Sequence, residues 1–282
     1  MSEMNHTVRG GRRLPGFDPR AYRNVVVLTG AGVSVASGIR PYRGPGGLWN
    51  DATLARLADI ETFVEEPLEV WKHWWKLREL ARAAGPNPAH LALAAFERAR
   101  PAGTRFTLVT QNVDGLHVRA GSSALVEYHG NALRTRCSDP RCGLEPYEDA
   151  AESGETVPRC PRCGANLRPD IVLFGESIPE AARDAVERAL AACDLFVAIG
   201  TSATVYPAAL FVDIAKRRGA RTVYLNLQGL DALGGSGSFD EEILGPAEIL
   251  VPLHFAPGAA DVDGDRDPDT PTGARDGFGG AS

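Results

Sequence analysis

The sequence has no long apolar run: none approaches the roughly 20 consecutive apolar residues that a membrane-spanning helix needs. The first residues also lack the apolar core of a secretory signal, so we expect no membrane association and a cytoplasmic location. Strong net charge is absent too, because the last 27 residues, with six Asp and two Arg, supply −4 of the total of −6. The remaining charge of −2 on residues 1–255 argues against nucleic acid as the primary ligand.

The two ends of the chain have little apolar periodicity. Residues 1–20 combine glycines and arginines and predict a mobile arm. Residues 256–282 are rich in Gly, Asp and Pro and cannot bury enough apolar surface to offset their ordering entropy. We expect this tail to be disordered.

Cysteine is scarce, but four of the five cysteines form two pairs. Four residues separate Cys137 from Cys142, two separate Cys160 from Cys163, and 17 lie between the pairs. Two such hairpins can converge on one tetrahedral zinc, and four sulfur ligands leave no open coordination position. The spacing therefore predicts one structural Zn²⁺. Cys193 lies in an apolar run and is expected in the core.

Short apolar runs alternate with segments of helical periodicity between the two ends. Runs of this length suit strands buried on both faces of a parallel sheet, and the alternation is typical of a doubly wound α/β domain. The predicted fold class is α/β, with a doubly wound parallel Rossmann-like sheet, a helical insertion and an inserted small zinc-ribbon module. We expect strands at 24–29, 105–110, 194–200 and 221–226, helices at 68–83, 88–99, 180–192 and 207–217, a main domain at 21–133 and 173–255 with its helical insertion at about 50–90, and a zinc module at 134–172.

Gly30 and Gly32 follow the first expected strand, where they would permit a tight turn and a close backbone approach to a pyrophosphate. A usual dinucleotide fingerprint has a third glycine where this chain has Val35, and its acidic residue ends a second strand, whereas Asp51 follows a turn-rich segment. A nicotinamide dehydrogenase is therefore disfavoured. An ordinary strand-to-helix turn is an equally good interpretation of the two glycines alone.

Polar residues also follow the second expected strand, in the run Gln111-Asn-Val-Asp-Gly-Leu-His117. Ligands of open α/β sheets bind at this edge, although Asn112 and Asp114 could equally be helix caps. His129 lies in Glu127-Tyr-His-Gly130 and can accept a proton from a hydroxyl near neutral pH.

The run from Ser34 to Trp49, with its Tyr-Arg-Gly step, closely resembles the cofactor-binding loop of the sirtuin family, and the two polar motifs follow in that family's order. The resemblance covers roughly residues 20–255 and is to the bacterial type, nearest to the desuccinylase-like class. It implies an NAD-dependent protein-lysine deacylase that releases nicotinamide, O-acyl-ADP-ribose and free lysine. By resemblance, His129 is the general base, Asn112 and Asp114 organise the nicotinamide site, and His117 is structural or lines the pocket. The implied cofactor-binding residues are Gly30, Ala31, Gly32, Ser34, Tyr42, Arg43, Trp49, Gln111, Asn112, Asp114, Gly200, Thr201, Ser202, Asn226, Leu227, Gln228 and Ala247.

The same resemblance implies that the segment Pro169 to Glu176 pairs with the substrate backbone, with Val172, Phe174, Gly175 and Glu176 as substrate-binding residues. In the desuccinylase-like class, a Tyr and an Arg three residues later bind the acyl carboxylate. Trp74 and Leu77 occupy these positions here, which favours acetyl or longer apolar acyl groups. A shift of one residue would offer Trp75 and Arg78, and a packed helix face containing Trp71, Trp74 and Leu77 is as good an interpretation.

Two other functions compete with deacylation. The same site could transfer ADP-ribose to a protein or to water. Alternatively, the chain could be a non-catalytic NAD-sensing or zinc-ribbon binding module, and a zinc ribbon with basic residues could bind nucleic acid. Six arginines give that last alternative some weight, but their position between His129 and the substrate segment argues against it: Arg134, Arg136, Arg141, Arg159, Arg162 and Arg168.

Overall fold

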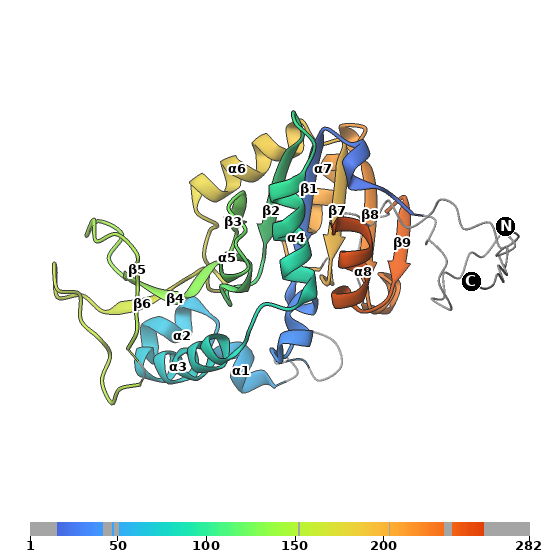
Figure 1. Ribbon diagram of the computed structural model, residues 1–282. Helices are drawn as coiled ribbons and strands as arrows, with labels where there is room; N and C mark the ends of the chain where they lie inside the picture. Colours follow the sequence, from blue (N-terminus) through green and yellow to red (C-terminus); the bar gives the residue numbers. More distant parts are fainter. Residues whose placement is uncertain are drawn as a thin grey trace, which may run out of the picture.

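The computed structural model describes residues 16–41, 47, 51–151, 153–202, 204–233 and 239–256, and its main body is a six-stranded parallel sheet (Figure 1). The strand order is β3-β2-β1-β7-β8-β9, and every neighbouring pair is parallel. The four strands expected from the sequence are all present, and the doubly wound α/β class is confirmed. The strands are β1 (Asn24–Thr29), β2 (Arg105–Thr110), β3 (Leu125–Glu127), β7 (Leu195–Ile199), β8 (Arg221–Asn226) and β9 (Glu241–Leu244).

Helices cover both faces of the sheet because its central strands are apolar on both sides. Val25 and Val27 of β1 pack in one core with α4 and α8, whereas Val26 and Leu28 pack in a second core with α6 and α7. A three-layer α/β/α sandwich results. The helices of this body are α4 (Pro88–Ala99), α5 (Leu116–Arg119), α6 (Glu180–Ala191), α7 (Phe211–Arg217) and α8 (Ala247–Phe255), with short 3-10 helices at Pro19–Ala21, Ala31–Ser37, Ala208–Leu210 and Asp231–Leu233.

A smaller part of the molecule lies beside one end of the sheet (Figure 1). It combines α1 (Ala52–Arg56), α2 (Ile60–Glu65) and α3 (Pro67–Ala83) with a three-stranded antiparallel sheet in the order β5-β4-β6. The strands are β4 (Gly130–Cys137), β5 (Tyr147–Glu148) and β6 (Leu167–Ile171). Arg78 joins the helices to the antiparallel sheet, because its fully buried guanidinium donates from α3 to the carbonyls of Ala132 and Arg134 in β4.

The structure refines the sequence expectations for the chain ends. Residues 16–20, grouped with the mobile arm on sequence grounds, instead pack on the body: Phe17 is buried and stacks on His254 of α8 with ring centroids 4.7 Å apart. Residues 1–15 and the predicted tail from residue 257 lie outside the described residues.

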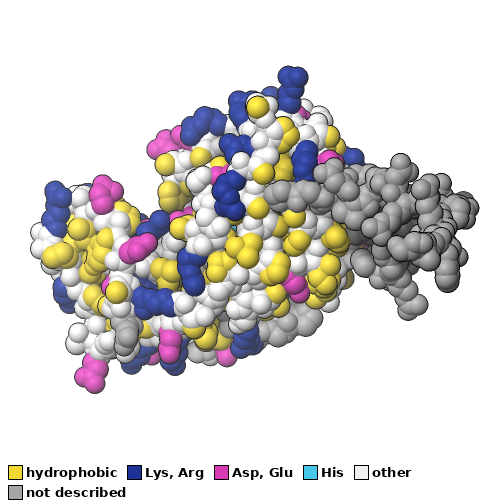
Figure 2. All heavy atoms as spheres, viewed as in Figure 1, with side chains coloured by type: hydrophobic (Ala, Val, Ile, Leu, Met, Phe, Trp, Pro, Cys, Tyr) yellow, Lys and Arg dark blue, Asp and Glu magenta, His cyan; other side chains and the backbone are white. Residues whose placement is uncertain are grey.

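The surface of the described residues shows neither a membrane span nor one dominant charge. No helix in the described part of the chain is long and apolar enough to cross a bilayer. On the face drawn in Figure 2, Lys and Arg side chains are spread out and interspersed with Asp and Glu rather than gathered in one continuous patch. This face therefore offers no extended track for a phosphate backbone.

Candidate active site

A cavity of about 1140 Å³ lies where the parallel strands end, between the sheet and the smaller part. This is the edge at which open α/β sheets bind ligands. Ser34, Asp114 and Leu77 do not line it, and Tyr42, Arg43 and Trp49 lie outside the described residues. The remaining residues predicted to act in catalysis or to bind the cofactor or substrate all line it: Gly30, Ala31, Gly32, Trp74, Gln111, Asn112, His129, Val172, Phe174, Gly175, Glu176, Gly200, Thr201, Ser202, Asn226, Leu227, Gln228 and Ala247.

The glycines at the start of the cavity allow two loops to touch through their backbones. The amide of Gly32 donates to the carbonyl of Gly200 at 2.8 Å, and the amide of Gly30 donates to that of Ile199 at 3.0 Å. A Cβ on Gly32 would lie 2.7 Å from Gly200 Cα, and one on Gly30 would lie 2.8 Å from the Gly200 carbonyl oxygen. The packing of the two loops therefore requires these glycines. Gly30 is the N-cap of the 3-10 helix Ala31–Ser37, and Gly32 lies in its first turn.

Beneath this loop, a buried polar network orders the polar residues that follow β2. Asn112 Nδ2 donates to the Gly30 carbonyl at 3.1 Å and to Ser34 Oγ at 3.2 Å, and Ser34 Oγ donates to Asp114 Oδ2 at 2.7 Å. Asp114 also accepts from the Leu116 amide at 2.9 Å, so it has the capping contact considered from the sequence. Burial raises the pKa of Asp114, although the hydrogen bonds from Leu116 and Ser34 oppose that shift. Asn112 lines the cavity, and Ser34 and Asp114 support it from behind the lining.

Two buried histidines extend this network, and the sequence pointed to only one of them. His117 lies under the sheet edge, where its Nε2 is 3.0 Å from Thr29 Oγ1, and its ring centroid is 4.7 Å from that of His90. His90 Nε2 in turn lies 3.4 Å from Ser34 Oγ. Burial lowers the pKa of His90 to about 4 and that of His117 well below its usual value, so both rings are neutral at pH 7. His117 is thus structural and does not line the cavity.

His129 is the histidine that faces the cavity. Its Nδ1 lies 3.0 Å from the carbonyl oxygen of Gln111, which can only accept, so Nδ1 carries the proton and Nε2 holds a lone pair. Burial lowers the pKa of His129, and the bond to Gln111 opposes that shift only partly. The ring is therefore neutral at pH 7 and can take a proton from a hydroxyl in the cavity.

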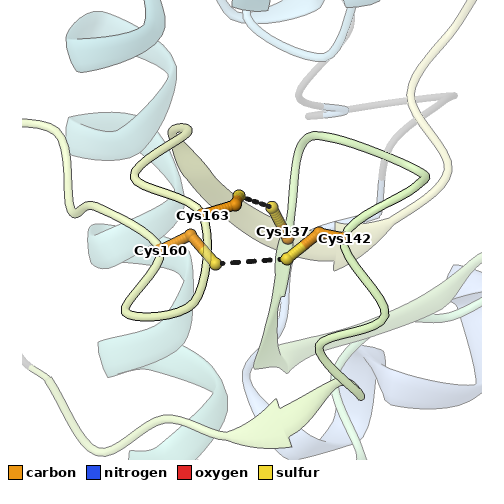
Figure 3. Close-up of side chains that lie close together, drawn as sticks. All are labelled: Cys137, Cys142, Cys160 and Cys163. Carbon is orange, nitrogen blue, oxygen red and sulfur yellow. Dashed lines mark hydrogen bonds between the residues drawn. The ribbon is translucent and has the colours of Figure 1, made fainter.

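The four paired cysteines converge as their spacing predicts (Figure 3). Their Sγ atoms all lie within 4.8 Å of one another, and Cys137 to Cys163 and Cys142 to Cys160 are each 3.5 Å apart. A Zn–S distance of 2.3 Å in a tetrahedron places sulfurs about 3.8 Å apart, so the thiolates fit one structural Zn²⁺. None of them forms a disulfide, and Cys193 is buried elsewhere in the core.

The arginines of the zinc module are largely engaged within the protein, which weakens the nucleic-acid alternative. Arg168 is buried and pairs with Glu176 at 2.6 Å. Arg134 pairs with Glu127 at 2.9 Å and with Asp170 at 3.0 Å. These guanidinium groups are neutralised by carboxylates and are poorly placed to attract phosphates.

Comparison with known proteins agrees with this arrangement of cavity, histidine and cysteines. A model described as "Sir2 family" matches residues 30–207. The chain belongs to the Sir2 family. It is similar to an NAD-dependent protein deacylase of Salmonella typhimurium, with 42% identity over 232 residues that cover 81% of each chain. It is also similar to the mitochondrial NAD-dependent protein deacylase sirtuin-5 of Xenopus tropicalis, with 37% identity over 255 residues, 83% of this chain and 82% of that one. A solved complex of a Sir2 homologue with NAD has a TM-score of 0.73 and 35% identity, covering 84% of this chain and 88% of that one.

The helix α3 of this sirtuin presents two adjacent stripes to two different neighbours. Val70, Trp74 and Leu77 pack in one cluster, and Trp74 lines the cavity. One residue further along, Trp71 and Trp75 pack against the cysteine cluster. Trp71 therefore does not share one packed face with Trp74 and Leu77, which is the arrangement considered from the sequence.

The second stripe also removes the alternative alignment of the acyl pocket. Trp75 faces the cysteines, and the guanidinium of Arg78 pairs with Asp149 at 3.0 Å in addition to its bonds to β4. Neither residue lines the cavity. Arg78 is thus committed to the zinc module and is not available to an acyl carboxylate.

The inner end of the cavity near Trp74 is apolar. Its additional lining residues come from three separate parts of the chain, and no motif marks them in the sequence. Alanine and valine at such positions look like ordinary core residues until the chain folds. The additional lining residues are Ala58, Val113, Ile171 and Leu173.

The segment predicted to pair with the substrate backbone is already held on one side. The Phe174 amide donates to the Ala58 carbonyl at 2.8 Å, and the Ile60 amide donates to the Phe174 carbonyl at 3.0 Å. Glu176 then accepts from the Leu173 amide at 2.8 Å and from both Nη atoms of Arg168. These contacts fix the turn that forms one wall of the cavity.

Proposed function

We propose that this sirtuin removes acetyl and longer apolar acyl groups from protein lysines. The chain is an NAD-dependent protein deacylase of the sirtuin family, which follows from the match of the Sir2 family to residues 30–207 and from the similarity to curated deacylases. A Sir2 protein has been solved with a deacetylated p53 peptide and 3'-O-acetyl ADP ribose; it is 29% identical to this chain, with a TM-score of 0.67. That complex supports an acyl-lysine peptide as substrate and O-acyl-ADP-ribose as product here.

The observation that carries the proposal is the neutral His129 at the cavity. NAD supplies the ribose carbon that receives the acyl oxygen and the nicotinamide that leaves. Asn112, supported by Asp114 through Ser34, holds the nicotinamide end of NAD. Gly30, Gly32 and the loop after β7 hold the diphosphate and adenosine end. His129 Nε2 takes the proton of a ribose hydroxyl, which makes that oxygen nucleophilic toward the acyl carbon. The bond from the acyl carbon to the lysine nitrogen then breaks, the nitrogen takes up a proton and leaves as free lysine, and one water completes the O-acyl-ADP-ribose.

The preference for apolar acyl groups rests on the side chains at the inner end of the cavity. Ala58, Trp74, Val113 and Leu173 offer no charged group to a carboxylate, and Arg78 is engaged elsewhere. A succinyl carboxylate placed there would lose water without gaining a partner. An acetyl or octanoyl chain would lose only apolar contact with water, which is favourable.

One peptide carrying acetyl-, succinyl- or octanoyl-lysine tests this proposal in an assay of nicotinamide release. We expect kcat/KM to be at least about tenfold lower for succinyl than for the better of the other two, since an unpaired buried charge is costly. The fastest turnover on the succinyl peptide would reject the acyl preference. Radiolabel from NAD retained on protein, without O-acyl-ADP-ribose, would reject deacylation in favour of ADP-ribosyl transfer.

A pair of substitutions in α3 tests the pocket itself. The double variant Trp74→Tyr, Leu77→Arg places a phenol and a guanidinium on the stripe that faces the cavity and should raise the succinyl-to-acetyl ratio of kcat/KM. Leu80→Arg adds the same charge to the same helix at a side chain that is 59% exposed, so it should leave the ratio unchanged. Equal effects of the two variants would show that added charge alone is responsible.

A further inference from the structure

One positive side chain among the described residues lining the cavity is uncompensated, and it is Arg183 of α6. The other charged lining residues are Glu176 and Glu248. Arg168 neutralises Glu176 with two hydrogen bonds of 2.6 and 2.7 Å. Glu248 belongs to α8 and is next to Ala247, one of the residues predicted to bind the cofactor. Arg183 is therefore the positive charge that the described lining offers to a bound molecule.

The guanidinium of Arg183 has no ion pair or hydrogen bond among the residues that the structure describes. Glu180, Asp184 and Glu187 share its helix and are exposed, but none of them is within ion-pair distance of it. The phenol of Tyr128 is near enough to be influenced by both Arg183 and Glu187. Arg183 is exposed and thus free to meet a charged group of a bound molecule.

Arg183 also lies where a bound peptide would pass. It is in the first turns of α6, which follows directly from the segment 172–178 that walls the cavity (Figure 1). Val205, Tyr206 and Pro207 form another part of the cavity wall, and Tyr206 is 63% exposed. A peptide whose acyl-lysine enters the cavity between these walls carries its neighbouring residues past Arg183. At about 3.3 Å per extended residue, positions within three of the lysine fall within about 10 Å of it.

We propose that Arg183 is a specificity-determining residue that selects peptides with an acidic side chain close to the acyl-lysine. The inference rests on the proposed function, because it assigns a role on the peptide side of the same cavity. Since the guanidinium is exposed, solvent screens the attraction and the expected gain is only about two- to fivefold in kcat/KM. The gain should shrink as salt is added.

The test uses the full chain and a set of acetyl-lysine peptides with Asp or Asn at each position from three before to three after the lysine. Asp and Asn have nearly the same shape, so their ratio of kcat/KM isolates charge. In the unsubstituted protein this ratio should reach about two to five at one or two positions. It should fall to about one in Arg183→Gln and below one in Arg183→Glu. Arg188→Glu makes the same charge change on the same helix, away from the cavity, and should keep the original ratio.

Three outcomes would overturn the inference. The first is an Asp-to-Asn ratio of kcat/KM near one at every position in the unsubstituted protein. The second is a ratio that remains unchanged in Arg183→Glu. The third is a rise in the KM of NAD in Arg183→Gln that is equal for all peptides. The last result would place Arg183 against NAD instead of the peptide. The same ratios measured as peptide Kd values by fluorescence anisotropy test the charge preference without turnover. A failure of the proposed function is therefore seen separately, as binding without deacylation.

Discussion

Replacing Arg168 with Gln removes the guanidinium that ties β6 of the zinc module to the turn lining the cavity. Arg168 is only 4% exposed. It donates to both carboxylate oxygens of Glu176, at 2.6 and 2.7 Å, and to the Ile171 carbonyl at 3.0 Å, while its guanidinium carbon lies 5.2 Å from the ring centroid of Phe63. Glu176 links this arginine to the Leu173 amide, from which it accepts a hydrogen bond of 2.8 Å. We expect Arg168→Gln to loosen that turn.

The expected loss of stability follows from the burial of the pair. Breaking a buried ion pair by removing one partner costs about 3–5 kcal/mol. Glu176 keeps the Leu173 amide and Arg136 at 3.5 Å, and its side chain is 19% exposed to water, so the lower end applies. A loss of about 3 kcal/mol corresponds to a fall in Tm of about 6–12 °C for an ordered chain of this size.

The loss should also depend on pH. Burial raises the pKa of Glu176, but the hydrogen bonds from Arg168 and Leu173 and the charges of Arg168 and Arg136 outweigh it, so the pKa is lowered. A lowered carboxyl pKa gives stability that is present above its unfolded value and is lost as the pH falls through its folded value. The difference in Tm between the original protein and Arg168→Gln should therefore shrink below about pH 4.5.

Thermal unfolding and steady-state kinetics of the full chain check this prediction. Arg168→Gln should raise the KM of the acyl peptide more than that of NAD, because the turn belongs to the peptide side. Arg56 makes a similar two-pronged pair with Glu66, at 2.8 and 3.2 Å, but on the surface, so Arg56→Gln should leave Tm and both KM values unchanged. Equal losses of Tm in the two variants would refute the reasoning that burial gives the Arg168 pair its strength.

Four further predictions test the rest of the site. His129→Ala should lower kcat by about 10²–10⁴ with an unchanged Tm. In the unsubstituted protein kcat/KM should fall only below pH 6.5, because burial lowers the pKa of His129 and its neutral form is the base; an acidic limb above pH 6.5 would contradict this. Gly32→Ala places a Cβ 2.7 Å from Gly200 Cα and should raise the KM of NAD, while Gly85→Ala, whose Cβ meets nothing within 4 Å, should not. Removal of metal should release one zinc per chain and unfold the β4 to β6 region, and Cys137→Ser should prevent its rebinding; unchanged near-ultraviolet circular dichroism after complete removal would speak against a structural metal.

Much of the framework was predictable because it depends on local sequence. The runs that became β1, β2, β7 and β8 are rich in apolar and β-branched residues, and their alternation with helices fixes a parallel sheet. Thiols at short spacing can converge on one metal whatever surrounds them. The loop glycines, His129 and the polar residues after β2 were found as members of ordered motifs.

The missing parts of the site depend on contacts between distant segments. His90 belongs to α4, and only folding brings it to Ser34, so its sequence context looks like an ordinary helix start. Ala58 reaches the cavity because the Phe174 segment pairs with it. The loop-to-loop contact of Gly32 with Gly200 is likewise invisible before β1 and β7 are neighbours. Periodicity identified α3 but could not decide which of its stripes faces the cavity, because both stripes are apolar.

The one-residue offset between the two stripes of α3 has a consequence for how such an enzyme changes over evolutionary time. Substitutions at Trp74 or Leu77 alter the surface next to the acyl chain, while Trp71 and Trp75 keep their packing on the cysteines. A lineage can therefore acquire a new acyl preference in a few steps without first rebuilding its metal module. An insertion or deletion of one residue in the first turns of α3 has the opposite effect. The 100° rotation per residue would turn one stripe toward the neighbour of the other and would turn the second stripe away from both neighbours, so both contacts would be lost at once.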